Sequence, residues 1–312
     1  MKKRFVILIF VLFFLAVIDL TQFSSDRQIL SILIPSFRLP RLLVVLAAGA
    51  ALSMAGFIIQ AVTDNPLADS ATLGISSGAS AGALGFLLFS TQLKLSTFWI
   101  FSYPIFALLG GILAFVLLYA FALRKNASSL RVLLTGVAIT AFFQALISLA
   151  QLSVNSFDFQ NVVVWLSGDV WQTDLTYLWL CLLLLMIAFI ILPFFQKKIE
   201  ILSLGEEMAM SLGLQVNKTK LQLYGLALFF SVIAVLLVGG LAFIGLIAPH
   251  IARELVGFKS RRRIPATLLS GMIILVFSDI LSQIMLAPSS LPLGIVVAFI
   301  GAPYYIYLIQ KV

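Results

Sequence analysis

Charged and reactive side chains are scarce in this sequence. Only 10% of its 312 residues are Asp, Glu, Lys or Arg, and it contains one cysteine and one histidine. The lone Cys181 allows no internal disulfide. His250 has no carboxylate or cysteine at metal-ligand spacing, so we predict no metal site. With so few reactive side chains, we expect no catalytic residues and no bound cofactor. The pattern G-x-x-x-x-G-K-[ST] is absent, so we expect no nucleotide hydrolysis by the chain itself.

Hydrophobic residues make up 62% of the chain and fall in blocks of about twenty. A helix of that length crosses about 30 Å of hydrocarbon and satisfies its own backbone amides there, and the alternation typical of a β-barrel is missing. We predict an all-α membrane protein with a single transmembrane domain over residues 1–312. The predicted spans, about ten, are 5–20, 42–62, 72–90, 98–121, 132–152, 176–195, 221–240, 245–257, 265–286 and 292–309.

The distribution of basic residues predicts the orientation. With a cytoplasmic N-terminus, sixteen of the 20 Lys and Arg residues lie on the inner side and four lie outside, namely Arg27, Arg38, Arg41 and Lys94. Such a bias predicts that both termini are cytoplasmic. It also explains the net charge of +8 without a nucleic-acid partner. We expect the run 261–263 to anchor the eighth and ninth spans at the membrane lipid, with anionic lipid binding as the alternative.

One polar loop, at about 203–215, interrupts two apolar spans. Its short predicted helix has a glycine on either side and two carboxylates in its first turn, which suits a helix N-terminus. A helix this short cannot span a bilayer, so we predict that it contacts a soluble partner on the cytoplasmic side. The candidate coupling residues are Gly205, Glu206, Glu207, Met208, Ala209, Leu212 and Gly213.

Small residues gather in the second span and at the start of the third. They predict close helix packing. Asn65 and Pro66, between these spans, end a helix and leave backbone groups that must face protein or a water-filled path. A similar glycine-rich break before Pro249 hints at a repeated half. A packing role and a role in a translocation path both stay open for one set of residues. These candidate path or gate residues are Gln60, Asn65, Pro66, Ser77, Gly78, Pro249 and His250.

Asp279 is the one acidic residue well inside a predicted span. A carboxylate at the centre of a membrane helix costs about 2.5 to 3.5 kcal/mol, so we expect Asp279 to face protein and to have a partner. A helix-packing hydrogen bond is one role. The alternative is a secondary carrier driven by an ion gradient through Asp279.

Several ordered motifs resemble the FecCD family of ABC transporter permeases, the membrane subunits of importers for iron-siderophores, haem and cobalamin. The motifs extend from residue 38 to residue 303. They are Arg38-Leu39-Pro40-Arg41, the stretch 48–60, Asn65-Pro66-Leu67-Ala68-Asp69, Leu73 to Ala79, Leu134 to Ala138, Trp165-Leu166-Ser167-Gly168, Gly205 to Gly213, Phe243 to Arg253, Leu291 to Gly294 and Gly301-Ala302-Pro303.

The resemblance implies a type II ABC importer bundle of ten helices per subunit in the bacterial cytoplasmic membrane. A second permease subunit, the same chain or a sister chain, completes the central path. A cytoplasmic ATPase dimer with ATP and Mg²⁺ docks under Gly205 to Gly213 and drives alternating access. An extracytoplasmic binding protein delivers the substrate and docks on Arg38 and Arg41, for which snorkelling anchors are the alternative.

The substrate implied is an iron(III)-siderophore, with haem or cobalamin as the alternative. Gln283 stands where the cobalamin permease of the family has an arginine that helps docking, which favours siderophore over cobalamin. Discrimination between ligands is expected mostly in the binding protein.

Overall fold

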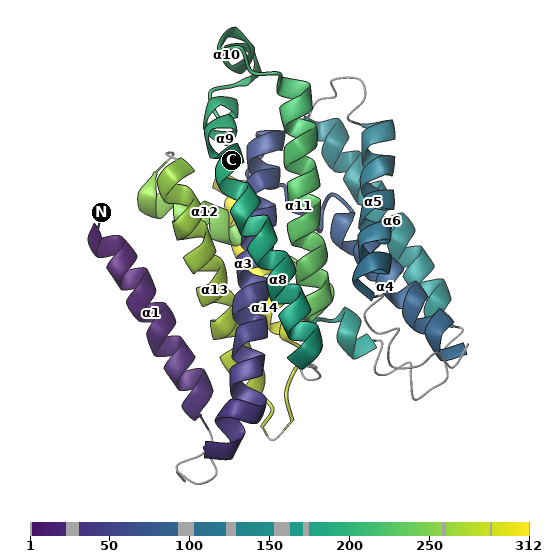
Figure 1. Cartoon of the computed structure of the whole chain (residues 1–312), viewed down its shortest axis with the longest axis vertical. Coiled ribbons are helices and arrows are strands. Elements are labelled where there is room, and N and C mark those ends of the chain that lie inside the picture. Colours follow the sequence, from purple (N-terminus) through teal and green to yellow (C-terminus); the bar gives the residue numbers. More distant parts are fainter. Residues whose placement is uncertain are drawn as a thin grey trace.

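The computed structural model describes residues 2–22, 31–92, 103–122, 129–152, 163–170, 175–257, 260–287 and 289–311. Arg27 and Lys94, two of the four predicted outer cations, lie outside these ranges, as do the first residues of the predicted span 98–121. Every regular element in the described ranges is a helix (Figure 1). The elements are α1 (Lys2–Thr21), η1 (Ile34–Arg38), α3 (Leu39–Thr63), α4 (Ile75–Gln92), α5 (Tyr103–Phe121), α6 (Ser129–Gln151), α8 (Leu175–Ile191), η4 (Leu192–Phe195), α9 (Gln196–Leu202), α10 (Glu206–Ser211), α11 (Val216–Val238), α12 (Ile244–Val256), α13 (Ser260–Ile284) and α14 (Leu293–Lys311).

Among the described residues, eight helices are long and apolar enough to cross a membrane. They correspond to eight of the predicted spans, and the predicted spans 72–90 and 245–257 correspond to α4 and α12. The 13 residues of α12 extend about 20 Å, which is less than the hydrocarbon thickness of about 30 Å. The all-helical membrane fold is therefore confirmed, and the count of ten crossings stays a prediction.

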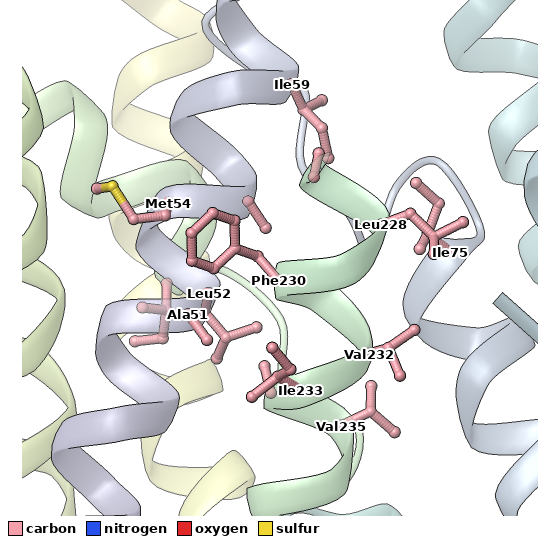
Figure 2. Packing of buried hydrophobic residues seen from close by; sticks show 14 of the residues in the cluster. Ala51, Leu52, Met54, Ile59, Ile75, Leu228, Phe230, Val232, Ile233 and Val235 are labelled. Carbon is pink, nitrogen blue, oxygen red and sulfur yellow. The ribbon is translucent and has the colours of Figure 1, made fainter. Parts of the chain in front are cut away.

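The centre of the bundle is formed by α3 and α11, which are buried over most of their lengths. Figure 2 shows Phe230 of α11 directed toward α3, and Met54 on the opposite face of α3. Both side chains are fully buried. Helices that are apolar on all sides and enclosed by other helices form the core of a membrane bundle.

Glycines bring several helix backbones into contact, as the small-residue pattern predicted. A Cβ atom built on Gly56 of α3 would lie 1.8 Å from the carbonyl oxygen of Gly245 in α12. A Cβ on Gly78 of α4 would lie 2.7 Å from the carbonyl oxygen of Gly110 in α5. These crossings tolerate no side chain, so glycine is required there by close approach and not by backbone conformation.

The two ends of the chain lie on the same side of the bundle as α10 (Figure 1). The helix α3 therefore starts on the opposite, outer side, and α1 and α13 end there. This arrangement agrees with the predicted topology, in which both termini and the polar loop 203–215 are cytoplasmic.

Candidate functional site

The loop 203–215 protrudes beyond the helical bundle and carries α10 at its tip (Figure 1). Gly205 precedes α10 with φ +96° and Gly213 follows it with φ +82°. Only glycine adopts such angles readily, and no atom lies within 4 Å of a Cβ built on either residue. The two glycines are thus needed for the sharp turns on either side of α10, as the sequence predicted.

The outward surface of this loop is apolar. The side chains of Leu204, Met208, Met210 and Leu212 are each more than half exposed, whereas Ala209 is buried. We call these four exposed residues the coupling ridge. An exposed group of large apolar side chains beyond the membrane spans is typical of a protein-docking surface.

The two acids at the start of α10 differ in their surroundings. Glu206 forms an ion pair of 2.6 Å with Lys220 in the first turns of α11. This contact ties the loop to the bundle. The side chain of Glu207 is exposed, as is that of Glu206. Each acid lies in the first turn, where a negative charge is favourable.

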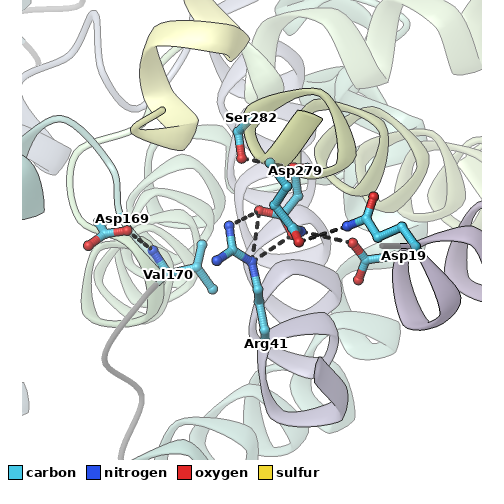
Figure 3. Close-up of polar contacts among 8 residues, drawn as sticks. Asp19, Arg41, Asp169, Val170, Asp279 and Ser282 are labelled. Carbon is cyan, nitrogen blue, oxygen red and sulfur yellow. Dashed lines mark hydrogen bonds and ion pairs between the residues drawn. The ribbon is translucent and has the colours of Figure 1, made fainter. Parts of the chain in front are cut away.

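A second polar group lies at the outer ends of α1, α3 and α13 (Figure 3). The Arg41 guanidinium donates through Nε and Nη2 to both carboxylate oxygens of Asp279, and the shortest contact is 2.7 Å. Asp279 is fully buried and the Arg41 side chain is 15% exposed. The expectation that Asp279 faces protein and has a partner is confirmed, since Arg41 neutralises it in a bidentate ion pair.

Two amides and a second acid extend this pair. Gln283 donates through Nε2 to Asp279 (2.9 Å) and to Asp19 (3.1 Å), and it accepts from Gln22 (2.7 Å). We call Asp19, Gln22, Arg41, Asp279 and Gln283 the outer polar cluster. Asp19, at the end of α1, is also buried. The sequence reading overlooked Asp19, although its position near the end of an apolar span was visible.

Arg38 lies beside this cluster and is half-buried. Its guanidinium donates to the backbone carbonyl of Leu20 at 2.6 Å. The predicted docking role of Arg38 and Arg41 is compatible with their place on the outer side. For Arg41, any docking contact must be made by a guanidinium that already holds Asp279.

The break between α11 and α12 forms a third feature, in the interior. Phe243 has φ +71°, which is unusual for a residue with a side chain and costs about 1 to 3 kcal/mol. Its backbone N–H donates to the buried Asp69 carboxylate, which also accepts from the backbone N–H of Ser70 at 2.6 Å. Gln60 donates to the carbonyl oxygens of Gly245 and Leu246. No role was predicted for Asp69 or Phe243, since phenylalanine carries no local signal for a positive φ and the contact with Asp69 joins segments far apart in the sequence.

The other predicted path residues make mainly local contacts. The Asn65 side chain accepts from the Leu67 backbone N–H at 2.8 Å in the turn that contains Pro66. The Ser77 hydroxyl donates to Gly74, and Gly78 lies at the crossing with α5. These contacts give each residue a packing role, and the path role stays a prediction.

His250 requires a correction. The sequence reading found no carboxylate at metal-ligand spacing, yet Glu254 follows one helical turn later and lies 3.4 Å from His250 Nε2. Pro249, beside it, is buried inside α12. The His250 ring also meets Tyr304 of α14 edge to face, at 6.0 Å between centroids. No group of three or more His, Cys, Asp or Glu that could hold a metal was found among the described residues.

Known proteins resemble the chain over nearly its full length. Residues 5–311 match the FecCD transport family. The chain is 37% identical over 277 residues to the iron(3+)-hydroxamate import system permease protein FhuG of Bacillus subtilis, covering 88% of this chain and 82% of that protein. It is 33% identical over 292 residues to the Fe(3+) dicitrate transport system permease protein FecD of Escherichia coli, covering 94% and 89%. For the vitamin B12 import system permease protein BtuC of Klebsiella pneumoniae, the identity is 35% over 276 residues, with 88% and 81% covered.

A solved structure shares the fold. It is described as a metal-chelate type ABC transporter in an inward-facing conformation, and it matches with a TM-score of 0.87 and 26% identity over 100% of both chains. Fold, span pattern and relatives together define a multi-pass permease subunit of an ABC transporter in a bacterial inner membrane. The chain belongs to the FecCD transport family.

Proposed function

We propose that this permease imports an iron(III)-siderophore across the cytoplasmic membrane by ATP-driven alternating access. The observation that carries the proposal is the family match over residues 5–311, together with relatives named for iron(3+)-hydroxamate and Fe(3+) dicitrate transport. Gln283, which stands where the cobalamin permease of the family has a docking arginine, hydrogen-bonds Asp19 and Asp279 within the chain. That internal use supports siderophore over cobalamin as the substrate.

Energy enters at the cytoplasmic side in this proposal. A partner ATPase dimer, which holds ATP and Mg²⁺, docks on the coupling ridge and α10, and the chain itself binds no cofactor. The exposed apolar side chains at Met208 and Leu212 support this assignment, because they lie beyond the spans at the tip of the loop. The loop continues directly into α11, and the exposed ion pair between Glu206 and Lys220 is one further contact between them.

The remaining partners follow from the same family. An extracytoplasmic binding protein delivers the substrate at the outer side, where Arg38 and Arg41 lie, and a second permease subunit completes the path. The chain then acts as one transmembrane domain over residues 1–312. One large hydrophobic cluster with members from α3, α5, α8 and α11 supports this view.

Reconstitution tests this function directly. Proteoliposomes containing the permease, its ATPase and the binding protein should accumulate a radioactive ferric hydroxamate when ATP is enclosed, and a non-hydrolysable analogue should give none. Cobalamin should not accumulate in the same vesicles. Uptake driven by a proton or sodium gradient without ATP would contradict the proposal.

Cobalamin import is the second candidate, since the identity to the vitamin B12 permease is 35%. The same vesicles decide between the two, because only the loaded binding protein needs to be exchanged. The ion-gradient carrier has weaker support, since Asp279 is held in a bidentate pair by Arg41. A carboxylate fixed in this way serves helix packing.

A further inference from the structure

Asp69 is a buried acid in the turn between α3 and α4. We call residues 65–74 of this turn the path turn, because it begins with two of the candidate path residues. Among the described residues, no Lys, Arg or His forms an ion pair with the Asp69 carboxylate. Its partners are the backbone N–H groups of Ser70 and Phe243 and the hydroxyl of Ser70. Because a buried charge without a counter-ion is costly, the carboxylate needs a further stabilising neighbour.

The start of α12 is that neighbour. A Cβ atom built on Gly245, the second residue of α12, would overlap Oδ1 of Asp69, so the carboxylate lies against the first turn of this helix. The N-terminus of a helix carries a partial charge of about +0.5, and an anion beside it is favourable. The absence of a side chain at Gly245 therefore lets the acid of the path turn reach α12.

Asp69 also supports the strained backbone just before α12. Phe243 has a positive φ, and a residue with a side chain keeps such a conformation only where its surroundings hold it. The hydrogen bond from the Phe243 N–H to Asp69 is one such support. The shape of the break between α11 and α12 and the position of the path turn are therefore linked through Asp69.

The break lies on a route from the loop 203–215 to the path turn. The helix α11 begins directly after that loop, and residues 239–243 join its end to the start of α12. A shift of α11 would reach Phe243 along the chain, and the contact with Asp69 would pass it to the path turn. The close packing of α11 on α3 offers an alternative route that does not involve Asp69.

We propose that Asp69 is a positioning residue of the transport cycle, which makes the path turn move together with the start of α12. The inference rests on the proposed ATP-driven transport. It adds the contact that connects energy input at the loop 203–215 to the candidate path. Asp69 acts in this way through the residues of the path turn.

The amount of substrate imported per ATP hydrolysed tests this role in vesicles that contain the permease, its ATPase and the binding protein. Asp69→Ala removes the contacts of the carboxylate, so the ratio should fall at least about fivefold while ATPase affinity stays parental. Asp69→Asn keeps an acceptor oxygen and loses the charge, so its ratio should lie between the two. A purely structural role would instead lower folded yield and reduce hydrolysis and uptake in the same proportion.

The matched control is Asp64→Asn. Asp64 is an exposed acid immediately before the path turn, and its φ of 49° is one that asparagine adopts readily. This variant removes the same charge from the same region without touching α12. It should keep the parental ratio of uptake to hydrolysis.

Cysteine labelling follows the path turn without any substrate. Cys181→Ser/Ala71→Cys places one thiol at a half-buried position of this turn. In the complex with the ATPase, the labelling rate should change when a non-hydrolysable ATP analogue binds, and Asp69→Ala in this background should abolish the change. Absence of ferric hydroxamate uptake together with an intact labelling change would reject the proposed substrate and leave the role of Asp69 standing.

Three results would overturn the inference. A labelling rate that ignores ATP in the Ala71→Cys protein would show that the path turn does not move. A parental ratio and labelling change in folded Asp69→Ala would assign the motion to the packing of α11 on α3. An equal loss in Asp64→Asn would remove the link to α12. If Asp69→Ala fails to fold, Asp69→Asn decides, and parental values in both measurements contradict the role of Asp69.

Discussion

The outer polar cluster and the coupling ridge differ in which side chains they bury and which they expose. At the outer ends of α1, α3 and α13, charged groups are buried and paired, with Asp279 fully enclosed and held by Arg41. At the inner side, Met208 and Leu212 are more than half exposed at the tip of the loop. Charged groups are buried where helices of this chain meet, and apolar side chains are exposed where no part of this chain covers them.

This difference separates the roles of the two regions. A buried ion pair between helices is complete within the chain, and removing one partner leaves an uncompensated charge. The apolar side chains of the coupling ridge are not buried by any described part of this chain, so another protein must cover them. Changes in the outer polar cluster should therefore act on folding, and changes in the coupling ridge should act on assembly.

Loss of Asp279 should have the largest effect. Asp279→Ala leaves the Arg41 guanidinium buried without its partner, at a cost of about 3 to 5 kcal/mol. Folded yield and the thermal midpoint in detergent should fall sharply. The control Arg38→Gln removes a half-buried cation that donates to a carbonyl, and it should change stability by about 1 kcal/mol. Equal stability of Asp279→Ala and the parental protein would show that the pair does not hold these helices.

Truncation of the coupling ridge should weaken assembly instead. Met208→Ala/Leu212→Ala removes apolar surface that contributes roughly 1.5 to 3 kcal/mol per fully buried side chain, so ATPase affinity should drop at least about tenfold. Stability of the isolated permease should stay within about 0.5 kcal/mol. Met186→Ala, at an exposed position of α8, is the matched control. Co-purification with the ATPase measures the effect, and normal affinity of the double variant would exclude the ridge from docking.

Glycine replacement tests the turns beside α10. Alanine at Gly205 or Gly213 must adopt a positive φ, which costs about 1 to 2 kcal/mol. The loop should shift and ATPase affinity should fall about five- to thirtyfold. Gly225→Ala in α11 meets no atom within 4 Å and should be neutral or slightly stabilising. Titration of ATPase binding to each variant compares them, and identical affinities would mean that the turn conformation is unimportant.

The exposed pair between Glu206 and Lys220 should matter least. Glu206→Gln removes an ion pair that solvent screens, which contributes about 0 to 1 kcal/mol. Coupling of ATP hydrolysis to uptake should change by less than about fivefold. The ratio of ATP hydrolysed to substrate imported measures this coupling. Complete uncoupling would show that the pair transmits the motion.

The sequence was sufficient for features with local signals. The apolar blocks locate the spans, although α11 and α13 each begin five residues before the predicted start. The turns beside α10 follow from Gly205 and Gly213, whose positive φ is confirmed. The short coupling helix with Glu206 and Glu207 in its first turn was also predicted correctly. Each of these signals lies within a few residues of the structure that it determines.

Features made by distant residues were not predictable. Arg41 and Asp279 are 238 positions apart, and their pairing depends on the packing of α3 on α13. Phe243 carries no signal for its positive φ, which is supported by a hydrogen bond to Asp69 from another loop.

One local signal was overlooked. Glu254 lies four residues after His250 on one helix face, and this spacing was visible in the sequence.

Cross-linking at the coupling ridge tests the central claim most directly. The chain has one cysteine, the buried Cys181, so Cys181→Ser/Met208→Cys presents a single exposed thiol at the tip of the loop. In native membranes this thiol should cross-link to the ATPase, with the yield changing when ATP is bound. Phe14→Cys in the same background, on the exposed face of α1, should give no ATPase product. Absence of a product at Met208, or an equal product at Phe14, would contradict energy input through this loop.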